Sequence, residues 1–371
     1  MKKRLVALFV CALIVLSGGT LLCQAAAQFK QLDKNGDGVI TPDELAKPKL
    51  FAKLDVNSDG KITPEEAKKA LNRLEKRASQ RAALPRPDES NVKYGLHERN
   101  VFDLWKAKSD KPTPLVVFIH GGGFVGGDKS AIPPSALKTA LDAGASVISI
   151  NYRFLKDAPI QEILRDTARA IQFVRANAAK FNIDPSRIAC FGSSAGAGAS
   201  LWLAVHPDLA DPNSEDAVAK QSSRISACAC LNGQATYDLL EWQNVIYPFR
   251  PEWMNSPTED LNFYHFKSRA DYDTEEGRKV LDDCSMLRLL SSDDPPIFMW
   301  CSLPNGDPKN RNHLLHHPKH VMAIKTKAEQ VGVKFEGHLA GDGQAKIGDP
   351  AVAAVEFLLK QMGCATNRAA Q

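Results

Sequence analysis

Residues 187–196 have the sequence RIACFGSSAG, and this stretch decides the fold of the longer part of the chain. Its first five residues are apolar enough to predict a buried strand, and the residues after it predict a helix. Between them, Gly192-Ser193-Ser194-Ala195-Gly196 matches the pattern G-x-S-x-G in a strand–turn–helix setting. The turn is strained and crowded, so it needs glycine, and it projects the Ser194 hydroxyl from the end of the sheet. Ser194 is therefore the predicted nucleophile.

Strand-like and helix-like stretches alternate on both sides of this turn. The predicted strands are Leu115–Ile119, Ser146–Ile150, Arg187–Phe191, Ile225–Leu231, Ile297–Cys301 and Val333–His338, and the main predicted helices are Ile160–Lys180, Ala195–Ala204 and Asn312–Val331. Alternation of this kind indicates the α/β class, with a mostly parallel sheet covered by helices on both faces.

A second motif, His120-Gly121-Gly122-Gly123-Phe124, directly follows the strand predicted at 115–119. Residues without side chains let backbone N–H groups approach a substrate oxygen, and such donors stabilise the oxyanion of acyl transfer. We expect this oxyanion hole to consist of Gly122, Gly123 and the N–H of Ala195. A glycine-rich phosphate loop is the alternative, but the sequence has no G-K-[ST] after these glycines.

Together these motifs resemble the α/β-hydrolase superfamily, and more narrowly the HGGG lipases and esterases, which include carboxylesterases and acetyl-xylan or feruloyl esterases. The resemblance covers about residues 96–363 and rests on His120–Lys129, Asn151-Tyr152-Arg153, Asp166 and Asp184–Gly196. It implies an α/β-hydrolase fold, ester hydrolysis without a catalytic cofactor, and a structural role for His120.

The remaining triad members are harder to place. A serine hydrolase of this group has the order Ser, Asp/Glu, His. The family pattern puts the acid at Asn305, so Asp307, two residues later, is the expected acid if the turn is longer here. Gln344 stands where the histidine is expected, and a glutamine cannot accept the serine proton. His338, on the last predicted strand, is the base that we name first.

A group of histidines on the preceding helical stretch is a second source of a base. Its members are His313, His316, His317 and His320. Such a cluster could also bind a metal or form a solvated helix face.

Two functional hypotheses remain open. The first is a serine esterase that hydrolyses carboxylic esters of small molecules or polysaccharides, with acetyl or feruloyl esters as candidates. The second is a catalytically impaired relative that binds a ligand or a partner. Residues 233–293 lack the strand–helix rhythm and contain four of the six tyrosines and two of the five tryptophans. An aromatic substrate wall and an ordinary packed insertion are both consistent with this composition.

Near the N-terminus, two twelve-residue loops, 33–44 and 55–66, repeat one pattern of oxygen-bearing side chains around a central glycine. Ca²⁺ takes six to eight oxygen ligands, which such spacing can supply. The predicted ligands are Asp33, Asn35, Asp37, the carbonyl of Val39 and Glu44 in one loop, and Asp55, Asn57, Asp59, the carbonyl of Lys61 and Glu66 in the other. Ile40 and Ile62 are expected to pair. The loops resemble EF-hands over about residues 28–75, which implies two Ca²⁺ sites.

Only ten residues separate the two loops, so the unit is more loop–helix–loop–helix than two complete hands. It also resembles a dockerin, which would imply docking onto a protein partner, but glutamate at position 12 favours plain calcium binding. We expect the calcium to be structural.

The first 27 residues have the pattern of a secretory signal peptide: Lys2-Lys3-Arg4, an apolar run from Leu5 to Leu16, and small residues up to Ala27. The apolar run is too short to span a bilayer comfortably, and no other run suggests a stable membrane span. We therefore expect a secreted or periplasmic protein. Cleavage would lower the formal net charge from +4 to +1, so no basic excess points to nucleic acid.

The expected domain plan is a signal peptide at 1–27, an EF-hand pair at 28–75, a helix end and linker at 76–95, and a hydrolase domain at 96–371. Six cysteines would remain after cleavage, and we expect most of them to be small core residues.

Overall fold

The computed structural model describes residues 29–45, 50–51, 54–55, 59–70, 72, 79, 84–250, 253, 257–340 and 347–364. The predicted signal peptide, the Gln344 position and Asn57 lie outside these residues. The chain divides into two compact units, Met1–Ala83 and Leu84–Gln371, which we describe separately.

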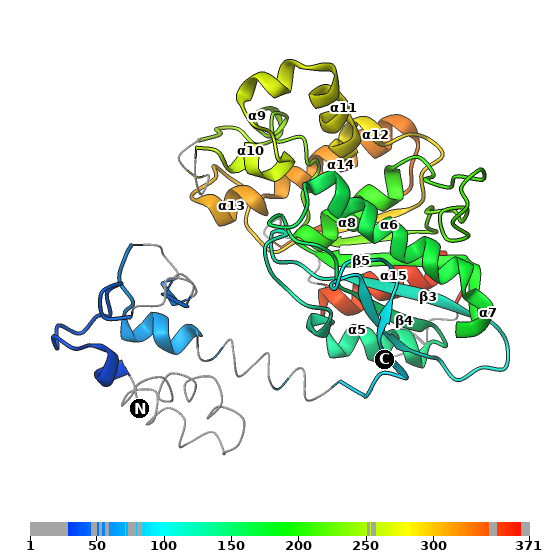
Figure 1. The fold of residues 1–371 in the computed structure, drawn as a ribbon, viewed down its shortest axis with the longest axis horizontal. Helices are drawn as coiled ribbons and strands as arrows, with labels where there is room; N and C mark the ends of the chain where they lie inside the picture. The colour runs from blue at the N-terminus through cyan, green and yellow to red at the C-terminus, as the bar shows by residue number, and fades with distance from the viewer. Residues whose placement is uncertain are drawn as a thin grey trace. The chain divides into compact units, whose positions relative to one another are not determined.

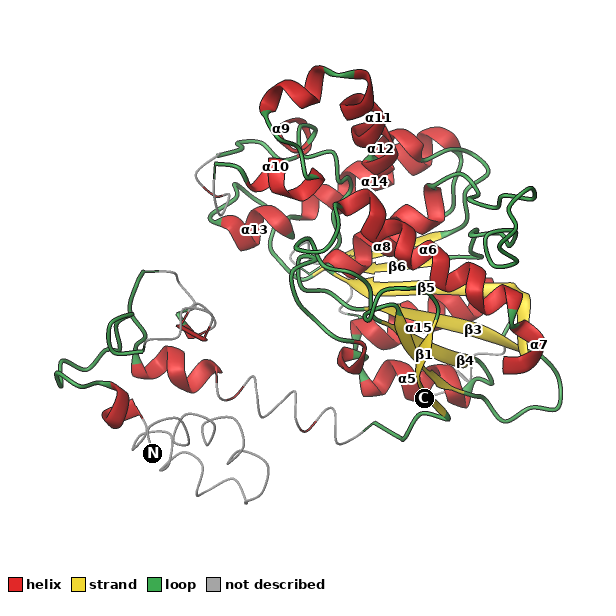
Figure 2. Cartoon of the chain, viewed as in Figure 1, coloured by secondary structure: helices red, strands yellow, loops and turns green. Residues whose placement is uncertain are grey.

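The larger unit is built on one eight-stranded sheet (Figures 1 and 2). Its strands are β1 (Glu89–Lys93), β2 (Val101–Trp105), β3 (Thr113–Ile119), β4 (Ser146–Ile150), β5 (Ile183–Ser193), β6 (Cys228–Leu231), β7 (Ile297–Cys301) and β8 (Phe335–Leu339). The spatial order is β1-β2-β4-β3-β5-β6-β7-β8, and β1 and β2 are antiparallel to their neighbours whereas the other strands are parallel. This is the predicted α/β-hydrolase architecture.

Helices cover both faces of the sheet because its strands are apolar on both sides. In β3, Leu115, Val117 and Ile119 belong to the core under one helical layer, whereas Val116 and Phe118 belong to the core under the other. The first layer contains α6 (Ile160–Ala176), α8 (Ala195–Val205) and α14 (Pro318–Val331), and the second contains α5 (Pro134–Asp142) and α15 (Pro350–Gln361). Figure 2 shows these layers above and below the strands.

All six predicted strands are present, but the edge strand β1 and its neighbour β2 escaped prediction. The strand β1 lies inside the segment assigned to the linker, so the sheet begins before residue 96. Its residues are largely exposed, and the ladder to β2 shifts register between Glu89 and Val92, so no clean alternation of apolar residues marks it. The strand β2 carries a buried Asp103, which the Nζ of Lys129 approaches to 2.6 Å.

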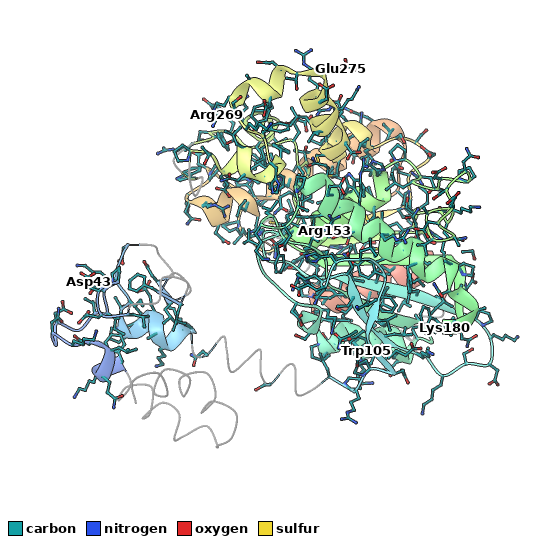
Figure 3. All side chains as sticks on the ribbon, in the orientation of Figure 1. Asp43, Trp105, Arg153, Lys180, Arg269 and Glu275 are labelled. Atoms are coloured by element: carbon teal, nitrogen blue, oxygen red, sulfur yellow. The ribbon has the colours of Figure 1, made fainter. Side chains whose placement is uncertain are left out.

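The insertion at 233–293 has only short helices among its described residues, as its lack of rhythm predicted. They are α9 (Trp242–Val245), α10 (Glu259–Tyr264), a 3₁₀ turn η4 (Arg269–Asp273), α11 (Glu275–Cys284) and α12 (Met286–Leu289). Figure 3 labels Arg269 and Glu275 in this part of the unit, and Arg153 beside α6, where its Nη2 lies 2.8 Å from an Asp166 oxygen.

The cysteines behave as core residues. Cys190, Cys228, Cys230, Cys284 and Cys301 are buried free thiols, and Cys364 is a half-buried free thiol. Cys228 and Cys230 share one face of β6, as their spacing predicted, and both pack in the core that contains α8.

The smaller unit contains both repeated loops. The predicted pairing of Ile40 with Ile62 is present as an antiparallel bridge, with N···O distances of 2.9 and 2.8 Å. Both side chains are buried in a small core with Leu45, Phe51 and Leu54. Among the described residues of the chain, no helix combines the length and the apolar composition that a membrane crossing requires.

The junction of β5 and α8 is crowded, because α8 passes close to the end of β3. A Cβ placed on Gly196 would lie 2.0 Å from the carbonyl oxygen of Ile119. No real Cβ can come so near to an oxygen, so the backbone would have to shift.

We therefore expect Gly196→Ala to lower the free energy of unfolding of the larger unit by about 1–3 kcal/mol, the usual range for overpacking. Gly348→Ala is the matched control, because a Cβ there meets nothing within 4 Å, and it should stay within about 0.5 kcal/mol of the natural chain. Chemical denaturation of the full chain measures both variants. Equal stability of the two would contradict the crowding argument.

Candidate active site

Ser194 stands at the turn between β5 and α8 in a backbone conformation that is rare for any residue except glycine. Its φ is +53° and its ψ is −120°. The turn is held from both sides: the Ser194 N–H donates to the Leu231 carbonyl of β6 at 2.9 Å, and its own carbonyl accepts from Ala197 and Gly198. This geometry is the strained elbow that the G-x-S-x-G motif predicted.

The side chain that meets Ser194 is His316. The Ser194 Oγ and the His316 Nε2 are 2.8 Å apart, although 122 residues separate them in the chain. His316 follows the short helix α13 (Arg311–Leu315) and precedes α14. We predicted one helix over 312–331, but Pro318 forces His317 into an extended conformation, with φ −72° and ψ 141°. The interruption turns His316 towards the elbow.

Side-chain hydrogen bonds hold this α13–α14 turn against the loop after β7 and against the insertion. The His313 Nε2 lies 2.9 Å from the Pro304 carbonyl, the His317 Nε2 lies 2.7 Å from the Gly306 carbonyl, and the two rings stack. From the insertion, the Gln234 amide donates to the Leu315 carbonyl at 2.7 Å. The histidine cluster is therefore mostly buried structural support, rather than the solvated face or the metal site considered from the sequence. The described residues contain no group of three His, Cys, Asp or Glu side chains placed to hold a metal.

The second ring nitrogen of His316 faces an amide. The His316 Nδ1 lies 3.2 Å from the Asn312 Oδ1, one helical turn earlier. Burial lowers the pKa of His316, a hydrogen bond to the Asn312 backbone raises it, and the charge of Arg311 lowers it, so that the pKa falls below the ordinary histidine value. The imidazole is thus neutral near pH 7 and can accept a proton at Nε2.

The two triad partners that we named first are not at Ser194. His338 lies on β8 with its Nε2 3.0 Å from a Glu336 oxygen and its ring against Phe298. Asp307 is exposed on the loop after β7, where its charge acts on His317. Both expectations are corrected by geometry: His338 contacts Glu336 of its own strand, and the charge of Asp307 acts on His317 and not on His316. The contact of Asn312 with the base was not anticipated. The one available signal for His316 was the His317-Pro318 pair, which predicts a helix break just after it.

The glycine loop lies beside the elbow. Gly122 and Gly123 have positive φ values of 122° and 61°, and both border the same cavity as Ser194 and Ala195. The Ala195 N–H is in the first turn of α8, where a helix offers no internal acceptor. His120 is fully buried, stacks on Tyr152 and has its Nδ1 2.8 Å from the Gly121 carbonyl. Burial lowers the pKa of His120 to about 4. This fits the structural role that the resemblance implied.

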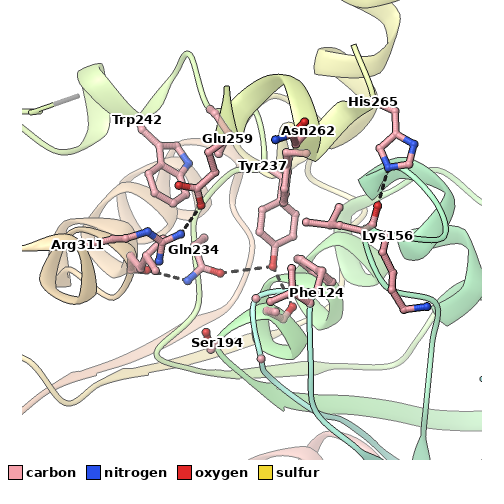
Figure 4. A pocket seen from close by; sticks show the side chains of 18 of the residues that line it. Phe124, Lys156, Ser194, Gln234, Tyr237, Trp242, Glu259, Asn262, His265 and Arg311 are labelled. Atoms are coloured by element: carbon pink, nitrogen blue, oxygen red, sulfur yellow. Dashed lines mark hydrogen bonds and ion pairs between the residues drawn. The ribbon is translucent and has the colours of Figure 1, made fainter. Parts of the chain in front are cut away.

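A cavity of about 830 Å³ opens over Ser194 (Figure 4). The insertion supplies much of its wall, so that segment is a pocket wall as well as packed structure. Of the aromatic residues noted in the sequence, Tyr237 and Trp242 line the cavity, together with Phe124, Phe263 and Phe266. The Tyr237 hydroxyl donates to the Ala195 carbonyl at 2.9 Å, which ties this wall to the elbow. Tyr264 and Tyr272 are buried in the insertion instead.

Charged residues stand at the rim of the cavity. Arg311 of α13 forms an ion pair with Glu259 of α10, as Figure 4 shows. This pair joins the insertion to the segment that carries His316. Lys156 lines another part of the cavity and pairs with Asp157 at 2.6 Å.

In the smaller unit, the two repeated loops make equivalent hydrogen bonds. The first aspartate of each loop, Asp33 or Asp55, accepts from the N–H of the central glycine, Gly38 or Gly60, at 3.0 Å. The last residue of each loop, Glu44 or Glu66, accepts from the backbone N–H and the hydroxyl of the threonine three residues earlier. The loops are therefore folded alike, as their common sequence pattern predicted.

The donors present suit a hard cation. The first loop has the carboxylates Asp33, Asp37 and Glu44, the amide of Asn35 and the carbonyl of Val39, all oxygen-bearing. Backbone hydrogen bonds, the one from Thr41 first, lower the pKa of Glu44 to about 2, so it is ionised at neutral pH. In the second loop, Asp55, Asp59, Glu66 and the Lys61 carbonyl are described, and Asn57 is not. Each carboxylate has about four lone-pair sites, so it could bind calcium while it still accepts from the backbone.

Comparison with known proteins gives one family match for the larger unit and another for the smaller unit. The BD-FAE family model matches residues 102–300, which is more than half of the chain, and the EF hand family model matches residues 25–47 and 49–69. Two curated relatives are similar over shorter stretches. Carboxylesterase NlhH of Mycobacterium tuberculosis is 37% identical over 120 residues, which are 32% of this chain and 38% of the relative. The probable isoprenylcysteine α-carbonyl methylesterase ICMEL1 of Arabidopsis thaliana is 32% identical over 152 residues, 40% of this chain and 31% of the relative.

The matched stretches thus span less than two fifths of these curated relatives. Solved structures resemble the fold over a longer range. A truncated form of a carbohydrate esterase from gut microbiota has a TM-score of 0.58 at 21% identity, covering 74% of this chain and 96% of the other. An acetyl ester-xyloside bifunctional hydrolase from Caldicellulosiruptor lactoaceticus has a TM-score of 0.53 at 21% identity, covering 76% and 96%. The chain belongs to the BD-FAE family of α/β-hydrolase esterases, with EF-hands in its N-terminal unit.

Proposed function

We propose that this protein is a serine esterase that hydrolyses carboxylic esters, with Ser194 as nucleophile and His316 as base. The observation that carries the proposal is the 2.8 Å distance between the Ser194 Oγ and the His316 Nε2, at the floor of a cavity bordered by the glycine loop. A base within hydrogen-bond reach of a serine hydroxyl is the first requirement of nucleophilic catalysis.

The reaction follows from this placement. As Ser194 Oγ bonds to the ester carbonyl carbon, its proton passes to the His316 Nε2, and the N–H groups of Gly122, Gly123 and Ala195 stabilise the oxyanion. The carbon–oxygen bond to the alcohol then breaks, and the Nε2 proton goes to the departing oxygen. Water attacks the acyl-serine with His316 again accepting a proton, which releases the acid and restores Ser194.

We propose as substrates esters of small molecules or polysaccharides, with acetyl and feruloyl esters as the candidates. The cavity supports this because about 830 Å³ exceeds the needs of a short acyl chain. The rings of Tyr237 and Trp242 offer flat apolar contacts to an aryl group or a sugar. The names of the relatives and neighbours also concern ester-cleaving proteins, two of them acting on carbohydrates or xylosides.

The second candidate is a catalytically impaired relative that binds a ligand or a partner. Its argument was the glutamine at the expected histidine position. That argument is weakened because His316 lies beside Ser194. Part of it remains, because the Nδ1 of His316 contacts an amide, Asn312, and not a carboxylate.

We expect Ser194→Ala and His316→Ala each to lower kcat/KM on a short activated ester by about 10²-fold or more, because each removes a partner of the proton transfer. Hydrolysis is measured with the purified mature protein, together with phosphonate labelling of Ser194. His338→Ala is the matched control and should keep the natural rate. An active His316→Ala variant, or an inactive His338→Ala variant, would refute the assignment of the base.

We propose two structural Ca²⁺ sites in the smaller unit, with the ligands named from the sequence. The EF hand match and the equivalent folding of the two loops support this assignment. When calcium is bound, it supplies a positive centre that neutralises the loop carboxylates, while Ile40 and Ile62 hold the two loops together.

Calcium at a hundredfold excess over its dissociation constant should stabilise the unit by about 2.7 kcal/mol for each occupied site. We therefore expect the melting temperature of the smaller unit in the full chain to rise on addition of Ca²⁺ and fall with a chelator, while ester turnover well below melting stays unchanged. Glu44→Gln and Glu66→Gln should each weaken the rise, and Asp43→Asn, at an exposed residue labelled in Figure 3, is the matched control. A calcium-dependent turnover would contradict a purely structural role.

We further propose that the protein is exported after cleavage behind Ala27, on the sequence pattern of residues 1–27. Expression in a host with a secretory pathway should yield an extracytoplasmic protein that begins at Gln28, as N-terminal sequencing would read. An intact N-terminus in the cytoplasm would refute export.

A further inference from the structure

The partner of His316 on the side away from Ser194 is an uncharged residue. Hydrolases with a serine, a histidine and an acid hold the base with a buried carboxylate, which selects one tautomer and stabilises the imidazolium. Here the Asn312 Oδ1 stands 3.2 Å from the His316 Nδ1. Among the described residues, no carboxylate makes a hydrogen bond to this imidazole.

An amide oxygen can perform one of those two tasks. If Nδ1 carries the proton, it donates to the Asn312 Oδ1, and Nε2 is left with the lone pair that the Ser194 hydroxyl needs. Asn312 lies one helical turn before the histidine, where i, i+4 side chains meet. Its backbone also acts on the imidazole, in the direction that raises the pKa of His316.

The backbone around His316 is braced without the side chain of Asn312: the His316 N–H donates to the Asn312 carbonyl at 3.2 Å, and a substitution at 312 keeps that carbonyl. Two further carbonyls accept hydrogen bonds from other segments. The Gln234 amide donates to the Leu315 carbonyl, and the Cys301 thiol donates to the His316 carbonyl at 3.1 Å. The orientation of the imidazole ring is therefore decided by its two nitrogen contacts, to Ser194 and to Asn312.

The charged and titratable groups around the ring do not replace a carboxylate. On its own segment, Arg311 is a cation that disfavours the imidazolium, and Glu259 of α10 is engaged with that guanidinium. On α14, the buried His320 has its Nδ1 occupied by the Ala235 N–H, and burial lowers its pKa to about 3. On β7, Cys301 faces the backbone. Asp307 acts on His317 rather than on His316.

We infer that Asn312 is the positioning residue of this site: it orients His316 and selects the tautomer with the proton on Nδ1, without contributing negative charge. The inference rests on the proposed function. The site then consists of Ser194, His316 and the uncharged Asn312. When His316 takes the serine proton, the imidazolium forms without a negative charge beside its Nδ1. A carboxylate at position 312 should then add the missing charge.

Two variants test the two halves of this inference. Asn312→Ala removes the side-chain contact, so kcat/KM should fall by about 10²-fold with KM little changed, the cost of a misplaced catalytic group. Asn312→Asp adds a negative charge beside His316, which favours the protonated ring. The lower-pH limb of the kcat/KM profile should therefore move to higher pH by about one unit.

Asn305→Asp is the matched control. It makes the same charge change at the exposed loop position where the family pattern puts the acid, and it should leave the profile unchanged. An NMR titration of His316 in all four proteins reads the tautomer and the pKa without any turnover. It should show the Nδ1–H form in the natural chain, a mixture in Asn312→Ala, and a raised pKa in Asn312→Asp only.

The outcomes separate this inference from the proposed function. If turnover does not depend on Ser194, the proposed function fails, and the titration alone then decides whether Asn312 sets the tautomer. If turnover depends on Ser194 but Asn312→Ala and Asn312→Asp keep the natural profile and tautomer, the inference fails by itself. A shift produced by Asn305→Asp instead would place the acid position on the loop after β7 and would also overturn it.

Discussion

The close contact between backbone segments at the end of β5 is the constraint on which the site depends. At Gly196 the helix α8 approaches the Ile119 carbonyl at the end of β3 so closely that no side chain fits between them. Because β5 must turn into α8 within one residue, Ser194 takes a backbone conformation with φ +53°. The same contact brings the glycine loop that follows β3 beside the first turn of α8. The proposed nucleophile and the proposed oxyanion donors therefore come from one packing arrangement of the central strands.

The proposed base, His316, belongs to a different part of the molecule. It comes from the α13–α14 turn after β7, a turn that exists because Pro318 cannot continue the preceding helix. Buried histidines that bond backbone carbonyls hold this turn in place, and Gln234 ties it to the insertion. The insertion in turn contacts the elbow through the Tyr237 hydroxyl. The pocket wall, the proposed base and the proposed nucleophile are thus linked by buried and partly buried hydrogen bonds, although they come from three separate segments.

The loops of the smaller unit are held mainly by contacts between residues that are close in the sequence. Each loop is built by short-range bonds between its own carboxylates and its own backbone, so one sequence pattern yields one structure twice. The pairing of Ile40 with Ile62 is the contact that joins the two loops. A metal bound there would act mainly on residues within a dozen positions of one another, which is why a structural role is the simplest expectation.

Local pattern in the sequence determined the central strands, the elbow at Ser194, the glycine loop and the paired loops, because each is a contiguous stretch whose spacing is itself the physical requirement. The edge strand β1 escaped because it is largely exposed, and its neighbour β2 escaped because it contains a charged residue at its centre. Only the tertiary structure decided which side chains meet the Ser194 hydroxyl and the histidine beside it. His316 was one of five candidate histidines, and neither it nor Asn312 carries a local signature of its role. Their contact with Ser194 spans more than a hundred residues and depends on a helix break, a loop path and buried side chains that act together. Such an arrangement is specified by packing between distant segments, and no spacing within a single segment encodes it.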